Sequence, residues 1–256
     1  MSFFTDVVKI VRENGNLLLK GVGNTMLIAV VGTIMGLLIG LLIGILRTMP
    51  FPKNTFLRGL HKFANGLCTV YIEIFRGTPM MVQAMVIYWG YAFASGGNTL
   101  PLVASGIIIV SINTGAYMSE IVRGGIISID KGQTEGAQAI GMTHLQTMIY
   151  VILPQVIRNI LPSVSNEFII NIKDTSVLNV IGVAELYFYA GVIQRFNLQI
   201  FQTYFVICVI YFILTFSISR LLRFIEKKLD GNNSYTICGS QSDPDAEIKI
   251  KADAKS

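Results

Sequence analysis

The sequence has little charge for its length. Only 14% of its 256 residues are Asp, Glu, Lys or Arg, against roughly 25% in a soluble domain, while 52% are hydrophobic. This composition is typical of an integral membrane protein and argues against a soluble globular one. A short apolar run followed by a small-residue cleavage site is also missing, so we expect no cleavable leader.

Cysteine and histidine are scarce as well. Cys68, Cys208 and Cys238 lie far apart and predict no disulfide framework. Neither His61 nor His144 has a second ligand at a spacing that a metal ion uses. We therefore expect no metal site, no cofactor in this chain and no catalytic residues, and an intramembrane enzyme is the least favoured function.

Long uncharged runs are present instead, and they predict membrane spans. Met26–Leu46 has 21 residues, enough to cross a hydrocarbon layer of about 30 Å. The 43 uncharged residues from Gly77 to Ser119 exceed one crossing and must fold back, for which SGGNTLP (95–101) is the turn signal. A third run of 24 residues covers Phe196–Ser219.

We expect an all-α integral membrane protein with about five transmembrane helices. The segment 123–172 is polar enough, with Arg158 and Glu167, to make hydropathy alone ambiguous there. The predicted spans are 22–46, a long broken second span ending near 94, 101–121, 154–173 and 198–221.

The positions of Lys and Arg predict the orientation. With the N-terminus outside, four basic residues face out, fifteen face the cytoplasm and Lys173 lies at or near the membrane. We expect an extracytoplasmic segment (1–20), a transmembrane domain (21–225) with a cytoplasmic loop (123–153), and a polar cytoplasmic tail (226–256). The composition of the tail predicts disorder. The net charge of +5 then reflects the membrane surface and not nucleic acid.

The stretch EGAQAIGMTHLQTMIYVILP (135–154) is too polar for a span and too apolar for a solvated loop. Asp130 can cap a helix, with Gln133 in the capping-box position. Glu135 in the first turn favours the helix dipole. Gly141 can end the helix in a left-handed conformation, and Pro154 suits the start of the next helix.

This loop resembles the cytoplasmic EAA loop of ABC-importer permeases. The matching residues are Glu135, Gly136, Ala137, Gly141, Leu153 and Pro154. Gly136 replaces the usual first alanine, and Val151 replaces an isoleucine. The blocks IFRGTPMMVQ, TGAYMSEIVRGGIISIDKGQTEGA and NEFIINIKDTSVLNVIGVAEL extend the resemblance to the polar amino-acid subfamily, which includes histidine, arginine and glutamine import, over roughly residues 15–225.

The resemblance implies a bacterial inner-membrane permease subunit that is not itself an enzyme. A cytoplasmic coupling helix between the third and fourth spans would dock on a separate ATPase subunit, present in two copies, which binds ATP and Mg. This chain has no G-x-x-x-x-G-K-[S/T] loop of its own. Further implied partners are a second permease chain, identical or homologous, an extracytoplasmic binding protein and a polar amino acid as substrate.

Several polar residues within the predicted spans are candidates for the substrate pathway. Glu167 and Asn171 are four positions apart and share one helix face. A carboxylate at that depth is costly, so it suggests a function such as substrate binding. The alternative is that Glu167 pairs with another charge and only fixes helix packing. Gln83 and Asn113 are further candidates, and either can simply bond a neighbouring helix.

Two pairs of charges are candidate gates or ion pairs. Glu73 and Arg76 are three apart, before the RGTP break, and either form a local ion pair or change partners during transport. Lys173 and Asp174 are either such a gate or a pair that fixes helix packing.

Glycines recur every four residues in the first span, at 32, 36, 40 and 44. Such a ridge lets helix backbones approach closely in lipid. Packing within the chain is the favoured interpretation, and a subunit interface is the alternative.

An ion-gradient-driven secondary transporter is the rival function, with Glu167 or Asp174 as a proton site. Such transporters often contain an inverted internal repeat, and none is visible between the two halves of this sequence.

Overall fold

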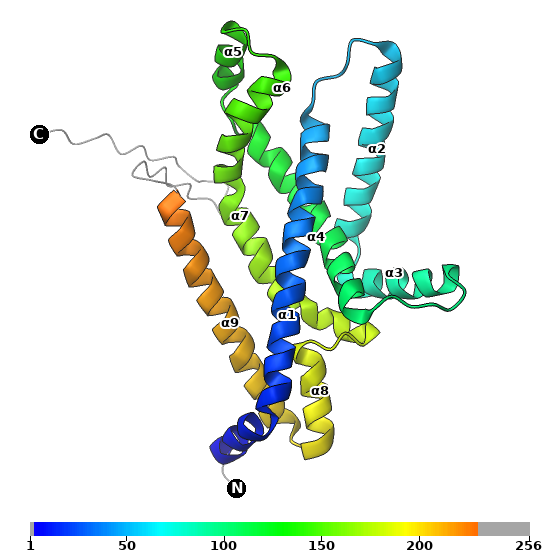
Figure 1. The fold of residues 1–256 in the computed structure, drawn as a ribbon, viewed down its shortest axis with the longest axis vertical. Coiled ribbons are helices and arrows are strands. Elements are labelled where there is room, and N and C mark those ends of the chain that lie inside the picture. The colour runs from blue at the N-terminus through cyan, green and yellow to red at the C-terminus, as the bar shows by residue number, and fades with distance from the viewer. Residues whose placement is uncertain (1–2, 230–256) are drawn as a thin grey trace, which may run out of the picture.

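The computed structural model describes residues 3–229, and these residues contain helices and no strand. The expected tail therefore lies outside the described residues from 230 onward. The elements are α1 (Phe3–Thr48), α2 (Thr55–Gly77), α3 (Met80–Ala94), α4 (Leu102–Ile127), α5 (Lys131–Ala139), α6 (His144–Thr147), the π-helix η1 (Met148–Ile152), α7 (Leu153–Asp174), the 3-10 helix η2 (Thr175–Ile181), α8 (Leu186–Asn197) and α9 (Ile200–Leu229) (Figure 1).

Four helical segments in the described part of the chain are long and apolar enough to cross a membrane. They are 3–48, 102–127, 144–181 and 200–228. The remaining predicted span is divided into the amphipathic α2 and the shorter apolar α3, which run in different directions (Figure 1). The all-α membrane fold is confirmed, with four clear spans and a shorter apolar helix, α3, within the predicted broken second span.

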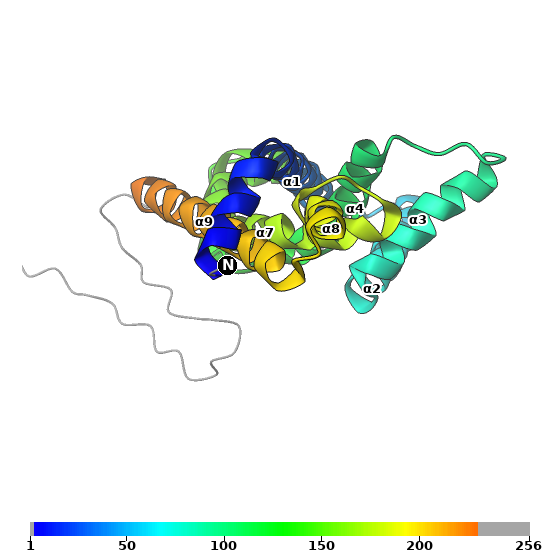
Figure 2. The same cartoon turned by 90° about the horizontal axis from the view of Figure 1, so that it is seen from below.

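The break between α2 and α3 follows from the RGTP sequence. Thr78 and Pro79 have extended backbones, with ψ of 149° and 135°. Proline disfavours the helical conformation in the residue before it, so the helix ends there. From below, α3 and α9 lie at opposite edges of the helix group (Figure 2).

The glycine ridge of α1 packs against α4. A Cβ atom added to any of the four glycines would lie 2.4–2.7 Å from an α4 side chain, too close for a real contact. The facing residues also recur every four positions, at Val110, Thr114, Met118 and Val122. The structure therefore confirms packing within the chain and does not leave this ridge for a subunit interface.

Helix α1 runs without interruption through residue 20, where the extracytoplasmic segment was expected to end. Its first half packs against α8 and α9 around Ile10, Leu18, Leu186 and Ile193. Residues 3–20 are thus packed within the helix group.

Candidate functional site: a helical loop and the polar face of α7

Helix α5 forms at the predicted position. The Asp130 carboxylate accepts a hydrogen bond from Gly132 N at 2.6 Å and caps its start. At its end, Gly141 adopts φ +86°, its N–H donates to the Gln138 carbonyl, and Met142 N donates to the Ala137 carbonyl at 3.1 Å. These two bonds form a Schellman motif, the termination expected from a glycine here.

The capping-box role expected for Gln133 is not observed. Its side-chain oxygen accepts a hydrogen bond from Gln155 on α7 at 3.3 Å. A capping box forms instead at the start of α6, where Thr143 and Gln146 bond each other's backbone N–H. The difference arises because Gln133 lies against α7 and takes a tertiary partner in place of a local one.

The chain does not restart at Pro154 after a break. Helix α6 continues through η1 into α7, with Leu153 N donating to the Met148 carbonyl. Proline lacks an N–H for the usual bond to the residue four positions back, and a wider π turn accommodates this loss without stopping the helix. The loop is therefore joined to α7 by continuous helix.

The surface of this loop is exposed and partly apolar. Glu135 and Gly136 are exposed, whereas Ala137 is buried against the neighbouring helix. Ile140 is 80% exposed and Leu145 60% exposed. The α5–α6 loop lies at one end of the molecule, the end where α1 connects to α2 (Figure 1).

Glu167 on α7 is 9% exposed and has no hydrogen bond or ion pair among residues 3–229. The Glu167–Arg and Lys173–Asp174 ion pairs considered from the sequence are not formed within that range. Asp174 lies seven positions, or two turns, beyond Glu167 on the same side of α7. An unpaired carboxylate within a span is costly, which makes Glu167 a candidate for binding a cation.

Asn171 forms hydrogen bonds to two other helices. Its amide donates to Thr33 Oγ1 on α1 at 2.8 Å and accepts from Thr114 Oγ1 on α4 at 3.1 Å. The side chain therefore joins three helices and has its main hydrogen-bonding groups occupied. The four-residue spacing from Glu167 predicts that both side chains lie on one face of α7, and both are buried. The hydrogen bonds of Asn171, however, depend on which residues of α1 and α4 lie beside it.

Gln83 and Asn113 are likewise occupied within the chain. Gln83 Nε2 donates to the carbonyls of Phe75 and Thr78, both at 2.9 Å, at the break after α2. Asn113 Nδ2 donates to Gln83 Oε1 at 2.8 Å. These contacts satisfy carbonyls that the broken helix leaves free, which favours a structural role over direct contact with substrate.

The expected Glu73–Arg76 ion pair is absent from the pairs formed within residues 3–229. Both side chains are exposed, and the Arg76 guanidinium lies over the Tyr117 ring of α4 at 5.5 Å. Attraction to the ring face replaces the local carboxylate as its partner.

Two charged clusters were not identified from the sequence. Glu120 on α4 pairs with Arg47 on α1 and with Arg123, which lies 2.8 Å away. The three-residue spacing of Glu120 and Arg123 was the available signal, whereas Arg47 required the fold. Glu185, fully buried, accepts hydrogen bonds from two N–H groups of the α8 start and from the hydroxyl of Tyr211.

Helix α7 also has an exposed polar face. Asn159, Ser163, Asn166 and Lys173 are exposed and separated by four, three and seven positions, so they share one side of the helix. Arg158 is exposed beside them. Such groups are costly against lipid, so this face requires water or protein.

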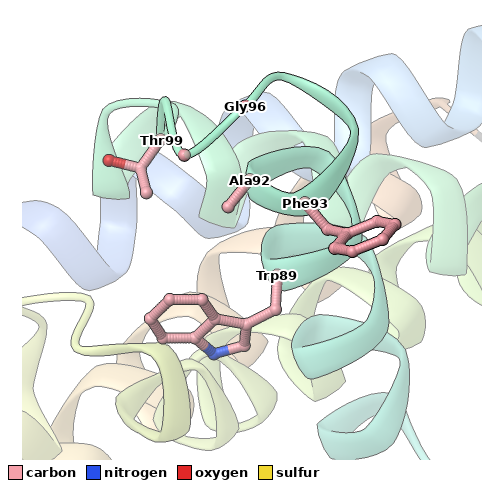
Figure 3. A pocket seen from close by; sticks show the side chains of 6 residues that line it. Trp89, Ala92, Phe93, Gly96 and Thr99 are labelled. Carbon is pink, nitrogen blue, oxygen red and sulfur yellow. The ribbon is translucent and has the colours of Figure 1, made fainter.

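An open pocket at the end of α3 is lined by Trp89, Phe93 and Thr99 together with Ala92 and two glycines (Figure 3). None of the candidate site residues predicted from the sequence lines this pocket. In the described part of the chain, no group of three or more His, Cys, Asp or Glu residues is placed to hold a metal ion.

The described residues thus form an all-helical membrane fold in which a helical loop continues into a span with an exposed polar face. The sequence profile of the family described as "Binding-protein-dependent transport system inner membrane component" matches residues 36–231. The chain belongs to this family of inner-membrane permease subunits of ABC importers, which work with an ATPase subunit and a binding protein and are not themselves enzymes.

Individual relatives agree with this assignment. The glutamine transport system permease protein GlnP of Escherichia coli is 38% identical over 213 residues, covering 83% of this chain and 93% of its own. The L-cystine transport system permease protein TcyB of Bacillus subtilis is 45% identical over 163 residues, covering 63% and 69%. A crystal structure of an amino acid ABC transporter with histidines matches with TM-score 0.74 and 34% identity, covering 89% and 99%.

Proposed function

We propose that this chain is the translocating subunit of an ATP-driven importer for polar amino acids. The observation that carries the proposal is the continuous helix from the exposed α5–α6 loop to the unpaired Glu167. A displacement of the loop is thereby transmitted to the candidate binding residue. The named substrates of the relatives, glutamine and cystine, support an amino acid as the transported molecule.

The assembly that we infer has two ATPase subunits at the α5–α6 end. Glu135, Gly136, Ala137, Gly141, Leu153 and Pro154 form or shape the surface that docks on them. A second permease chain, identical or homologous, covers the polar face of α7, because lipid would leave Asn159 and Asn166 without hydrogen-bonding partners. The N-terminus is outside and the binding protein docks there; ATP and Mg belong to the ATPase.

The mechanism is alternating access. ATP-driven closure of the ATPase subunits moves α5 and α6, and α7 moves with α6 because no break separates these two helices. Glu167 and Asp174 then hold the ammonium or another cationic group of the substrate within the passage beside α7. Hydrolysis resets the passage toward the cytoplasm, and no bond in the amino acid is broken.

Uptake into proteoliposomes containing the assembled transporter tests this function. We expect uptake that requires ATP and the binding protein, stops with orthovanadate and survives ionophores that collapse ion gradients. Uptake that continues in the presence of vanadate but stops with the ionophores would instead establish a secondary transporter driven by an ion gradient. A ligand screen on the cognate binding protein identifies the amino acid.

A further inference from the structure

The connection between α1 and α2 carries positive charge without compensation. The 25 residues that follow Arg47 contain no Asp or Glu. Lys53, Arg58 and Lys62 are exposed and form no ion pair among residues 3–229. The first turn of α2 contains no acidic residue, so the helix dipole adds to the positive potential.

One face of α2 is apolar and uncovered along its length. Six side chains, spaced alternately four and three positions apart, are each more than half exposed: Phe56, Leu60, Phe63, Leu67, Val70 and Ile74. They span 19 residues, and the first and last lie about 27 Å apart along the helix. This length is close to the roughly 30 Å of a hydrocarbon layer, so the face fits lipid acyl chains.

The cations lie at the same end of α2 as the first residues of the apolar face, but on other sides of the helix, because Arg58 and Lys62 each follow a residue of that face by two positions. This end stands apart from α1 (Figure 1), and every residue from 55 to 60 is exposed. The ring of Phe51 contacts that of His61, with centroids 5.3 Å apart, and so holds the connecting segment beside the helix. Lys53 therefore stays at the same end as Arg58 and Lys62.

We propose that this end of α2 binds the headgroups of anionic phospholipids, with Lys53, Arg58 and Lys62 contacting their phosphates. An acidic protein surface would neutralise the cations but leave the apolar stripe uncovered. Phospholipids around this end satisfy both, because their acyl chains cover the apolar face while their headgroups, all at one depth, surround the start of the helix and reach the cations. The site is independent of the proposed substrate and mechanism. The proposed orientation places it in the cytoplasmic leaflet, and only this placement rests on the proposed function.

Native mass spectrometry of the purified transporter tests this site. The protein is titrated with phosphatidylglycerol or phosphatidylcholine in detergent, and bound lipid is counted. Each single substitution, K53Q, R58Q or K62Q, should weaken phosphatidylglycerol binding about fivefold, and the triple variant at least tenfold. Phosphatidylcholine binding should not change, and high salt should weaken phosphatidylglycerol binding to the wild type.

The matched control is K9Q/R12Q/K20Q, which removes the same charge from a region where Asp6 and Glu13 already compensate part of it. It should retain phosphatidylglycerol binding. Equal loss in both triple variants would show unspecific attraction and overturn the proposal, as would unchanged binding in the α2 variant. Loss of ATPase co-purification with unchanged lipid binding would assign the surface to the ATPase and also overturn it. If the triple variant is not monodisperse, the graded single variants decide.

Discussion

At the scale of single residues, hydrogen-bonding partners separate structural from functional polar groups. Asn171, Gln83 and Asn113 are all buried within apolar helices, and each has a partner on another helix or at a helix break. Glu167 is similarly buried and has none within residues 3–229. This criterion favours a structural role for the three amides and leaves Glu167 as the candidate for contact with substrate.

Glu167→Gln should lower substrate uptake at least tenfold while leaving membrane abundance and basal ATPase activity near normal. The substitution keeps the side-chain shape and removes the charge that attracts a cationic group. Uptake and ATPase activity are measured on the same proteoliposomes, with Glu13→Gln, an exposed carboxylate near the start of α1, as the control. Unchanged uptake would make Glu167 a packing residue, and a collapse in abundance would make it a structural charge.

Asn171→Leu should destabilise the protein because it leaves Thr33 and Thr114 without their shared partner. A buried polar group that loses its hydrogen bond costs about 1–3 kcal/mol. The thermal unfolding midpoint in detergent should fall by several degrees, whereas Asn16→Leu, at an exposed position of α1, should leave it nearly unchanged. Equal midpoints for the two variants would show that the hydrogen bonds of Asn171 to α1 and α4 do not stabilise the protein.

At the scale of helices, the packing of α1 on α4 and the continuity of α6 with α7 create one connected unit. The glycine ridge brings α1 and α4 together, the Arg47–Glu120 pair joins their ends, and Asn171 attaches α7 to both. Helix α5 connects to this unit on both sides, through three residues to α4 and through α6 and η1 to α7. A force on α5 should therefore move the three spans together.

Gly40→Ala should reduce folded protein in the membrane and lower the unfolding midpoint. The added Cβ would lie 2.4 Å from that of Met118 and force α1 away from α4. Gly23 is the matched control on the same helix, because nothing lies within 4 Å of its added Cβ. Gly23→Ala should be neutral or should stabilise the protein, by up to about 1 kcal/mol, through its higher helix propensity. A similar fall of the unfolding midpoint in both variants would contradict the role of the glycine ridge in packing α1 on α4.

Glu135→Lys and Gly141→Pro should leave the protein inserted but uncoupled from the ATPase. Proline cannot adopt the φ of +86° found at Gly141, and lysine reverses the charge on the exposed surface of α5. Pull-down of the ATPase and substrate-stimulated ATP hydrolysis provide the readouts. Gly136→Ala restores the residue usual in the resembling loops and meets no atom within 4 Å, so it should retain coupling. Wild-type coupling in Glu135→Lys and Gly141→Pro would exclude the docking assignment.

At the scale of the whole molecule, the unequal distribution of Lys and Arg sets the proposed orientation, with four outside and fifteen inside. The α1–α2 connection, α5 and α6 share one end of the structure (Figure 1). This shared end agrees with one cytoplasmic surface that carries both the loop and the basic start of α2.

Cysteines placed at Ser2 and, separately, at Ser256 should react with an impermeant maleimide from opposite sides of the membrane. The background lacks Cys68, Cys208 and Cys238 so that only the introduced thiol reacts. Cells and inside-out vesicles are labelled in parallel, with detergent-opened samples as the measure of full reaction. Labelling of both positions from the same side would mean an even number of crossings.

The sequence by itself determined the membrane class, the approximate spans, the break at RGTP, the position of α5 and the family. These features depend on local composition, on proline and glycine conformations and on the spacing of neighbouring residues, all of which are readable along the chain. The tertiary structure decided which residues pair with Asn171, Gln83 and Arg47. It also decided that the glycine ridge of α1 packs against α4 and that α6 continues into α7. Those outcomes depend on contacts between residues tens of positions apart, such as the 138 positions that separate Thr33 from Asn171. Buried polar groups take whichever partner the packing brings within bonding distance, and no local pattern specifies that partner.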